Sequence, residues 1–314
     1  MSPVVYRIRT LLSQVLEDVP LGTNLALFTL LWMLLSGRLL QSRGAVIPAL
    51  ADLGLPADAV RRAWAALAYG RWTLQPLLDR WQALVQAEGR WQPHVYGGLR
   101  PVACDLVGLF RPRLQHCPTK HYSSAAGKAL PAIPFGVVVA VGSVGSQRLP
   151  LPRQVLRATP EEDPSETALQ RRLLQLVAHT LAADEALVSD RGFPLADVLA
   201  AKQVIGAQRQ FVFAAESRQR LPELAFLAGS ILTYAAATAP AVRTGFWDRA
   251  AQPTCGRLRR LLARVHFADL EGLPGHFRKK ATVTDHLPKG ILGHRRQPAS
   301  PPPQPGVPRA PCFA

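Results

Sequence analysis

The chain has 314 residues, with 37 Lys and Arg against 21 Asp and Glu, a net charge of +16 and a pI near 10.8. Hydrophobic residues make up 48% of it, which is enough for a real core and excludes a wholly disordered chain. A globular protein this basic is typical of polyanion binders, and nucleic acid is the first partner to consider. The alternative is a composition effect, because Arg and Ala are abundant in proteins encoded by GC-rich genomes.

The first half of residues 1–98 contains the longest apolar run, residues 25–35, and it has eleven residues. A membrane span needs about 20 residues, so we expect this run to form a buried helix. We expect no membrane partner and no leader segment, and we predict a cytoplasmic, prokaryotic protein that associates with DNA.

The cysteines give no sign of a metal cluster or of disulfides. No two of them form a C-x-x-C pair, and the neighbouring histidines lack zinc-finger spacing. We therefore expect free thiols and a reducing compartment. The residues concerned are Cys104, Cys117, Cys255 and Cys312.

Residues 45–70 predict two short helices around a turn, the second of them over 57–69. This second helix carries Arg61 and Arg62 on one side and apolar residues on the other. A helix-turn-helix has this organisation, and its second helix enters the major groove. Arg61 and Arg62 are therefore candidate DNA-binding residues. An ordinary helical hairpin with a solvated arginine face is the alternative.

The middle of the chain changes character and becomes rich in β-branched and glycine residues. Residues 101–110, 133–144 and 147–156 predict three consecutive antiparallel strands. A capped amphipathic helix over 165–182 and a short strand over 186–190 follow. The order strand, strand, strand, helix, strand predicts an α/β fold with a mixed sheet.

The remainder of the chain reads as helical and basic. Helices are predicted over 195–207, 221–237 and 257–264, the last of which is amphipathic and rich in Arg. Residues 241–297 are predicted to form a basic helical region, and the proline-rich residues 298–314 a disordered tail.

Two acids stand out because each lies in or at the end of an apolar strand, namely Asp105 and Asp190. A carboxylate in such a place costs free energy unless something compensates it, and Mg²⁺ accepts carboxylate oxygens. A pair of metal ions can act on a phosphodiester, which fits a basic protein. The alternative is structural: Asp105 pairs with Arg111 or Arg113, and Asp190 caps the turn that follows it.

Three segments resemble the catalytic domain of insertion-sequence DDE transposases. These are VACDLVGLFRPRL, then KHYSSAAGKALPAIPFGVVVAVGSVG, then LVSDRGFPL; with the stretch AAKQVIGAQRQFVFAAESRQRLPELAFLAGSILTY the resemblance covers residues 20–297. It implies an RNase H-like fold, in which Asp105 and Asp190 are the catalytic pair and hold Mg²⁺ or Mn²⁺. It also implies strand cleavage and transfer at transposon ends, with Lys202 on a phosphate of the end. The alternative for Lys202 is an ordinary helix lysine exposed to solvent.

The chain departs from that family at the third acid, a helical Glu in the pattern Y-x₂-R-x₃-E-x₆-K. Lys202 best matches the Lys, and Leu195 then stands where the Glu belongs. Only eleven residues separate Asp190 from Lys202, too few for a fifth strand and the start of the third-acid helix. We infer an internal deletion and expect impaired cleavage. The acids that could substitute are Asp197, Glu216 and Glu223.

The resemblance implies a division of the chain into a helical region at 1–98, an incomplete RNase H-like core at 99–240 and the basic helical region at 241–297. The expected partner is double-stranded DNA at transposon ends, and homodimer formation is left open. Two alternatives remain: a non-catalytic DNA-binding protein derived from a transposase, which would use residues 45–70 and the basic region, and a relic with an incomplete fold.

Overall fold

The computed structural model describes most of the chain from Ser2 to Phe277. The described residues are 2–111, 114, 117, 119–123, 125–158, 162–189, 204–205, 212, 214–243, 246, 248–249, 251–270 and 273–277. The predicted helix over 195–207 and the proline-rich tail lie outside these residues, apart from 204–205.

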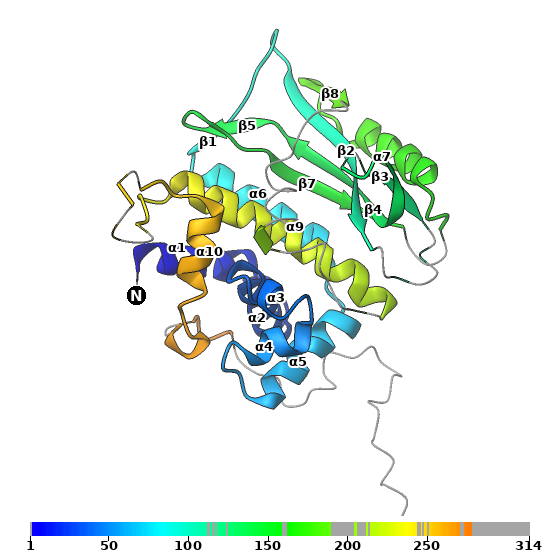
Figure 1. Ribbon diagram of the computed structural model, residues 1–314. Coiled ribbons are helices and arrows are strands. Elements are labelled where there is room, and N and C mark those ends of the chain that lie inside the picture. The colour runs from blue at the N-terminus through cyan, green and yellow to red at the C-terminus, as the bar shows by residue number, and fades with distance from the viewer. Residues whose placement is uncertain are drawn as a thin grey trace, which may run out of the picture.

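Six helices precede the first strand and form the helical side of the molecule (Figure 1). They are α1 (Pro3–Val15), α2 (Thr23–Leu35), α3 (Arg38–Gln41), α4 (Val46–Ala51), α5 (Ala57–Tyr69) and α6 (Leu74–Ala87). The apolar run becomes α2, which is buried on nearly all sides, as expected. Gly37 ends it in the left-handed conformation, with φ at 72°, and Gly54 separates α4 from α5 with φ at 76°.

The strands follow in two sheets. They are β1 (Trp91–Pro93), β2 (Arg100–Phe110), β3 (Lys120–Ser123), β4 (Lys128–Ala140), β5 (Gly142–Val144), β6 (Gln147–Arg148), β7 (Leu151–Leu156) and β8 (Glu185–Ser189). In the larger sheet the order is β3-β4-β2-β8, and β7 also pairs with β4. β4 pairs antiparallel with both β2 and β7, whereas β8 lies parallel to β2. The prediction of a mixed α/β sheet is confirmed.

Helices cover both faces of the larger sheet (Figure 1). On one face, α7 (Glu166–Thr180) packs Leu173 and Val177 against Val102 and Cys104 of β2. The hydroxyl of Ser165 caps α7 by accepting from the N–H of Ala168, as its sequence predicts. On the other face lie α6 and α9 (Ala215–Thr238).

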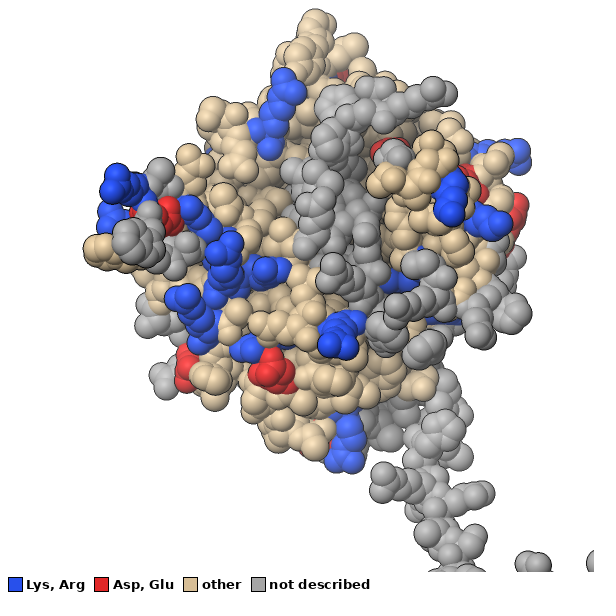
Figure 2. Space-filling view, in the orientation of Figure 1, with Lys and Arg blue, Asp and Glu red and all other residues tan. Residues whose placement is uncertain are grey.

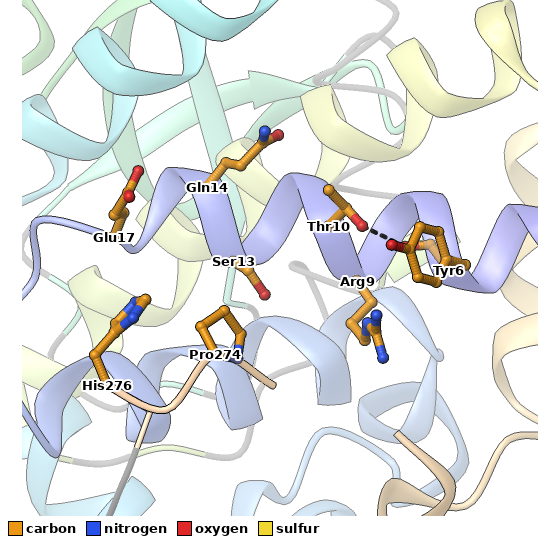
Figure 3. Close-up of a pocket in the computed structure, with 8 residues that line it drawn as sticks. All are labelled: Tyr6, Arg9, Thr10, Ser13, Gln14, Glu17, Pro274 and His276. Carbon is orange, nitrogen blue, oxygen red and sulfur yellow. Dashed lines mark hydrogen bonds between the residues drawn. The ribbon is translucent and has the colours of Figure 1, made fainter. Parts of the chain in front are cut away.

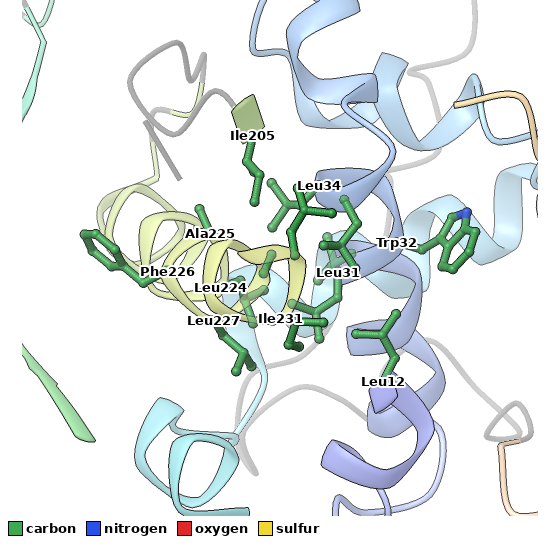
Figure 4. Close-up of a cluster of buried hydrophobic side chains, with 14 of the residues drawn as sticks. Leu12, Leu31, Trp32, Leu34, Ile205, Leu224, Ala225, Phe226, Leu227 and Ile231 are labelled. Atoms are coloured by element: carbon green, nitrogen blue, oxygen red, sulfur yellow. The ribbon is translucent and has the colours of Figure 1, made fainter. Parts of the chain in front are cut away.

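α9 joins the sheet to the helical side. Its residues are buried from Leu221 to Ala236. In Figure 4, Leu224 and Ile231 of α9 gather with Leu31 and Leu34 of α2, while Phe226 points away from α2. The Phe226 ring meets that of Phe135 on β4, with centroids 5.6 Å apart. One hydrophobic cluster therefore runs from the N-terminal helices through α9 to the sheet.

The predicted elements and the structure agree for the most part and differ on several strands. β1 was not predicted, and the predicted strand 147–156 is divided into β6 and β7. α5 has the predicted bounds, but the apolar run 133–144 is broken at residue 141 into β4 and β5. β3 was not foreseen, because its KHYS sequence lacks an apolar alternation. The proposed division at residue 98 stays a prediction, and the described residues on its two sides share a core.

Candidate functional site

Asp105 lies in the middle of β2, opposite Val137 of β4. Because side chains alternate along a strand, Asp105 faces the same way as Ala103 and Val107. Those two residues belong to the cluster that contains α9, whereas Cys104 belongs to the cluster under α7. The Asp105 side chain is therefore on the α9 face of the sheet, where it is partly buried. Its Oδ1 accepts a hydrogen bond of 2.7 Å from the N–H of Leu106.

β8 brings the segment before Asp190 beside β2. Its register with β2 pairs Val188 with Ala103 and Ser189 with Cys104. The last described pair of the two strands, Cys104 and Ser189, consists of the residues that directly precede Asp105 and Asp190 in the sequence. Asp190 lies outside the described residues, as do Lys202, Leu195 and Asp197.

The structural alternative for Asp105 does not hold for Arg111. These residues are six positions apart along an extended strand, about 20 Å, which is beyond the reach of a salt bridge. Arg111 is buried at the end of β2, and burial lowers the pKa of its guanidinium to about 10. Arg113 lies outside the described residues.

Glu216 and Glu223, two of the candidate third acids, both bind Arg157. This arginine directly follows β7, and its guanidinium contacts both carboxylates at 2.7 Å. Glu216 also accepts from Arg220 at 2.9 Å. The cluster joins the end of β7 to the first turns of α9. These contacts commit the two carboxylates to cations of the chain itself.

The pKa values of the two carboxylates shift in opposite directions. Glu223 has a side chain only 8% exposed, and burial raises its pKa despite the attraction of Arg157. Burial also opposes ionisation of Glu216, but its bonds to Arg157 and Arg220 outweigh burial and lower its pKa. The sequence offers no pattern that pairs Arg157 with α9, because Arg157 and Glu216 are about 60 residues apart in the chain.

Arg61 and Arg62, the predicted DNA-binding pair, have different surroundings on α5. The Arg61 side chain is 71% exposed, with its guanidinium 3.8 Å from Asp58. The Arg62 side chain is 13% exposed and binds Asp58 at 2.9 Å. Arg61 is thus presented to solvent, while Arg62 serves mainly as an intrahelical ion pair.

A pocket of about 330 Å³ opens on the outer side of α1, away from the sheet (Figure 3). Its walls come from one face of α1 and from the segment 273–277. It includes no residue that the sequence reading assigned to a site. The residues that line it are Tyr6, Arg9, Thr10, Ser13, Gln14, Glu17, Pro274 and His276.

Within the described part of the chain, no three His, Cys, Asp or Glu side chains gather in a way that could hold a metal ion. Asp105 offers a suitable hard oxygen donor for Mg²⁺, but a single carboxylate does not complete a site. The described residues therefore supply one member of the predicted set.

α9 has the length and apolar composition of a membrane span between Glu216 and Thr238. Of its most apolar window, 89% is buried inside the molecule, so we interpret α9 as a core helix.

Comparisons of the chain with family models, with curated proteins and with solved structures found no match.

Proposed function

We propose that this chain is a transposase-family protein with an RNase H-like core, which acts on DNA with a divalent metal ion. The observation that carries the proposal is the register of β2 and β8, with Cys104 opposite Ser189. Each of these residues precedes one of the two aspartates, Asp105 and Asp190. Paired positions of parallel strands present side chains to the same face, so this register favours a shared site.

The connection of the strands also supports the proposal. An antiparallel series of β2, β4 and β7 is followed by α7 and then by β8, parallel to β2. Asp105 on the central β2 faces α9 rather than α7. This order of elements, with Asp105 in the middle of β2, is what the resemblance to the transposases implies.

In this function, Asp105 and Asp190 hold Mg²⁺ or Mn²⁺. A bound divalent ion supplies Lewis acidity at the scissile phosphodiester. The Leu106 N–H, which donates to Asp105, fixes the orientation of that carboxylate. Because Glu216 and Glu223 are bound to Arg157, neither is available as a third ligand of the metal ion. We propose that cleavage is weak or absent in this copy.

A cleavage assay tests the catalytic proposal. The purified chain is incubated with labelled DNA from the flanks of its own coding sequence, with Mg²⁺ or Mn²⁺ and with EDTA as the control. We expect slow, metal-dependent nicking at most, which Asp105→Ala abolishes while DNA binding persists. Robust strand transfer would contradict the predicted defect, and nicking that survives Asp105→Ala and EDTA would contradict the site itself.

A non-catalytic DNA-binding protein is the second candidate, and the commitment of Glu216 and Glu223 to Arg157 favours it. Such a protein binds DNA equally with and without metal and with a steep dependence on salt. Electrophoretic mobility shifts with and without EDTA distinguish the two candidates when they are read beside the cleavage assay.

A further inference from the structure

Arginine side chains gather on one side of the helical half, over α10 (Cys255–Leu262) and the segment that precedes it. Figure 2 shows this concentration of basic side chains on the face turned to the viewer. Leu258 and Leu262 bury the inner side of α10. Arg260 is exposed on α10, exposed Arg264 follows the helix, and exposed Arg249 precedes it. We call Arg249, Arg260 and Arg264 the arginine surface.

Two other arginines hold α10 in place. Arg257 binds the Asp248 carboxylate at 2.9 Å and donates to the Gln252 carbonyl at 3.1 Å. Arg259 donates to the Val204 carbonyl at 2.9 Å. Its side chain crosses Gly37 so closely that a Cβ at Gly37 would lie 2.6 Å from Arg259 Cδ. The α10 arginines thus divide between anchoring and exposed positions.

Two carboxylates that adjoin this region are already neutralised by other arginines. Asp248 is bound to Arg257, and Asp52 is bound to Arg38 at 2.6 Å. Arg38 also donates to the carbonyl of Ala263, at the end of α10, at 2.7 Å. Among the described residues, no salt bridge joins the arginine surface to a carboxylate. Its positive charge is therefore directed to solvent.

We propose that the arginine surface binds the phosphodiester backbone of DNA. Arg260 is on the last turn of α10 and Arg264 is in the turn that directly follows it, four residues further along the chain, so the two exposed side chains can reach phosphates of one strand. Arg257, in the first turn of α10, binds Asp248, the residue directly before Arg249. This ion pair holds Arg249 near the start of α10, so that Arg249 extends the surface beyond the helix. The proposal rests on the proposed function for its choice of DNA, but it requires no metal chemistry.

The surface favours nucleic acid over an anionic membrane. A helix that lies on a membrane needs an apolar face to insert beside its basic one. The apolar residues of α10 are occupied instead: Leu258 and Leu262 are buried and Leu261 packs against the core.

The test measures DNA binding by fluorescence anisotropy over a salt series, in EDTA, with a labelled 30-base-pair duplex. The variant is R249Q/R260Q/R264Q. The matched control is R71Q/R148Q/R171Q, which removes three exposed arginines from other parts of the chain. We expect the surface variant to weaken binding roughly tenfold or more and to flatten the log–log salt slope by about two to three, with the control much closer to the wild type.

Three results would overturn the proposal. They are an equal effect of both triple variants, no DNA binding by the wild type, and a loss of binding to phosphatidylserine vesicles without a change on DNA. Matching melting temperatures of the variants confirm that folding is intact. Because the binding assay contains EDTA, its outcome does not depend on metal-dependent cleavage. A failed cleavage assay therefore does not contradict the arginine surface, and equal binding by the two triple variants does not contradict the proposed metal site.

Discussion

At the residue scale, Asp105 and its neighbours show how one strand position acquires its surroundings. Burial raises the pKa of the Cys104 thiol, and the adjacent Asp105 carboxylate raises it further. Cys104 therefore remains a protonated, apolar core residue under α7. Asp105 points to the opposite face, and alternation along β2 alone separates the two environments.

Gly142 offers a residue-scale prediction about the small sheet. A Cβ there would lie 2.3 Å from Cζ2 of Trp91 and 2.5 Å from the carbonyl oxygen of Gln92. Trp91 has little room to move, because its indole N–H donates to the Leu149 carbonyl at 2.8 Å. We expect Gly142→Ala to lower the free energy of unfolding by about 1–3 kcal/mol, measured by urea denaturation.

Gly256 on α10 is the control for that substitution. A Cβ at Gly256 would meet no described atom within 4 Å, and Ala is the better helix former. Gly256→Ala should therefore leave stability unchanged or raise it by up to about 1 kcal/mol. Equal destabilisation by both substitutions would show that the close approach of Trp91 is not the cause.

At the element scale, the ion pairs of Arg157 connect the end of β7 to α9. Arg157 donates to Glu216 and Glu223, which are seven residues apart on α9. Seven residues are about two helical turns, so both carboxylates lie on the same side of the helix. One guanidinium thus orients α9 across the sheet. Buried contacts of this kind favour one arrangement of the elements more than they add stability.

Glu216 carries the pH prediction for this connection. Its pKa in the folded protein lies below its ordinary value of 4.5, so the ionised form stabilises the fold above that pH. The stabilisation is lost as the pH falls through the folded pKa. Glu216→Gln should therefore destabilise the protein at pH 7, and the difference from wild type should shrink below pH 4.5.

Denaturant melts at pH 7, 5 and 3.5 measure this difference. Asp18→Asn is the control, because the Asp18 side chain is 80% exposed and lies 3.9 Å from the Arg80 guanidinium. A deficit of the Glu216→Gln variant that is constant across the three pH values would rule out ionisation as its origin.

At the scale of the whole molecule, the two sides of the predicted boundary at residue 98 share one core. Phe226 of α9 packs on Phe135 of the sheet, while its neighbours on α9 pack on α2. A core shared in this way favours unfolding as one unit. It also bears on the alternative of an incomplete relic, which would lack a cooperative transition.

Phe226→Ala tests this unity. We expect it to lower the free energy of unfolding by about 3–5 kcal/mol and Phe226→Leu to lower it by less. Tryptophan fluorescence, which reports mainly on the helical side, and far-ultraviolet circular dichroism should shift together. Two separate transitions in the wild type, or a shift in only one signal, would contradict the shared core.

The sequence by itself determined what depends on neighbours in the chain. The bounds of α5, the cap of α7 and the burial of α2 follow from periodicity and capping, which act over a few residues. The positive charge likewise follows from composition. β3 escaped this reading because its four residues lack a local apolar pattern.

Only the tertiary structure decided which segments meet. In the folded chain, β8 pairs with β2, Asp105 faces α9, and Glu216 and Glu223 form ion pairs with Arg157. The tertiary structure also separated exposed Arg260 from anchoring Arg259, although the two are adjacent in the chain. These outcomes depend on contacts between residues far apart in sequence, whose free energies come from burial and from charges that only the folded chain brings together.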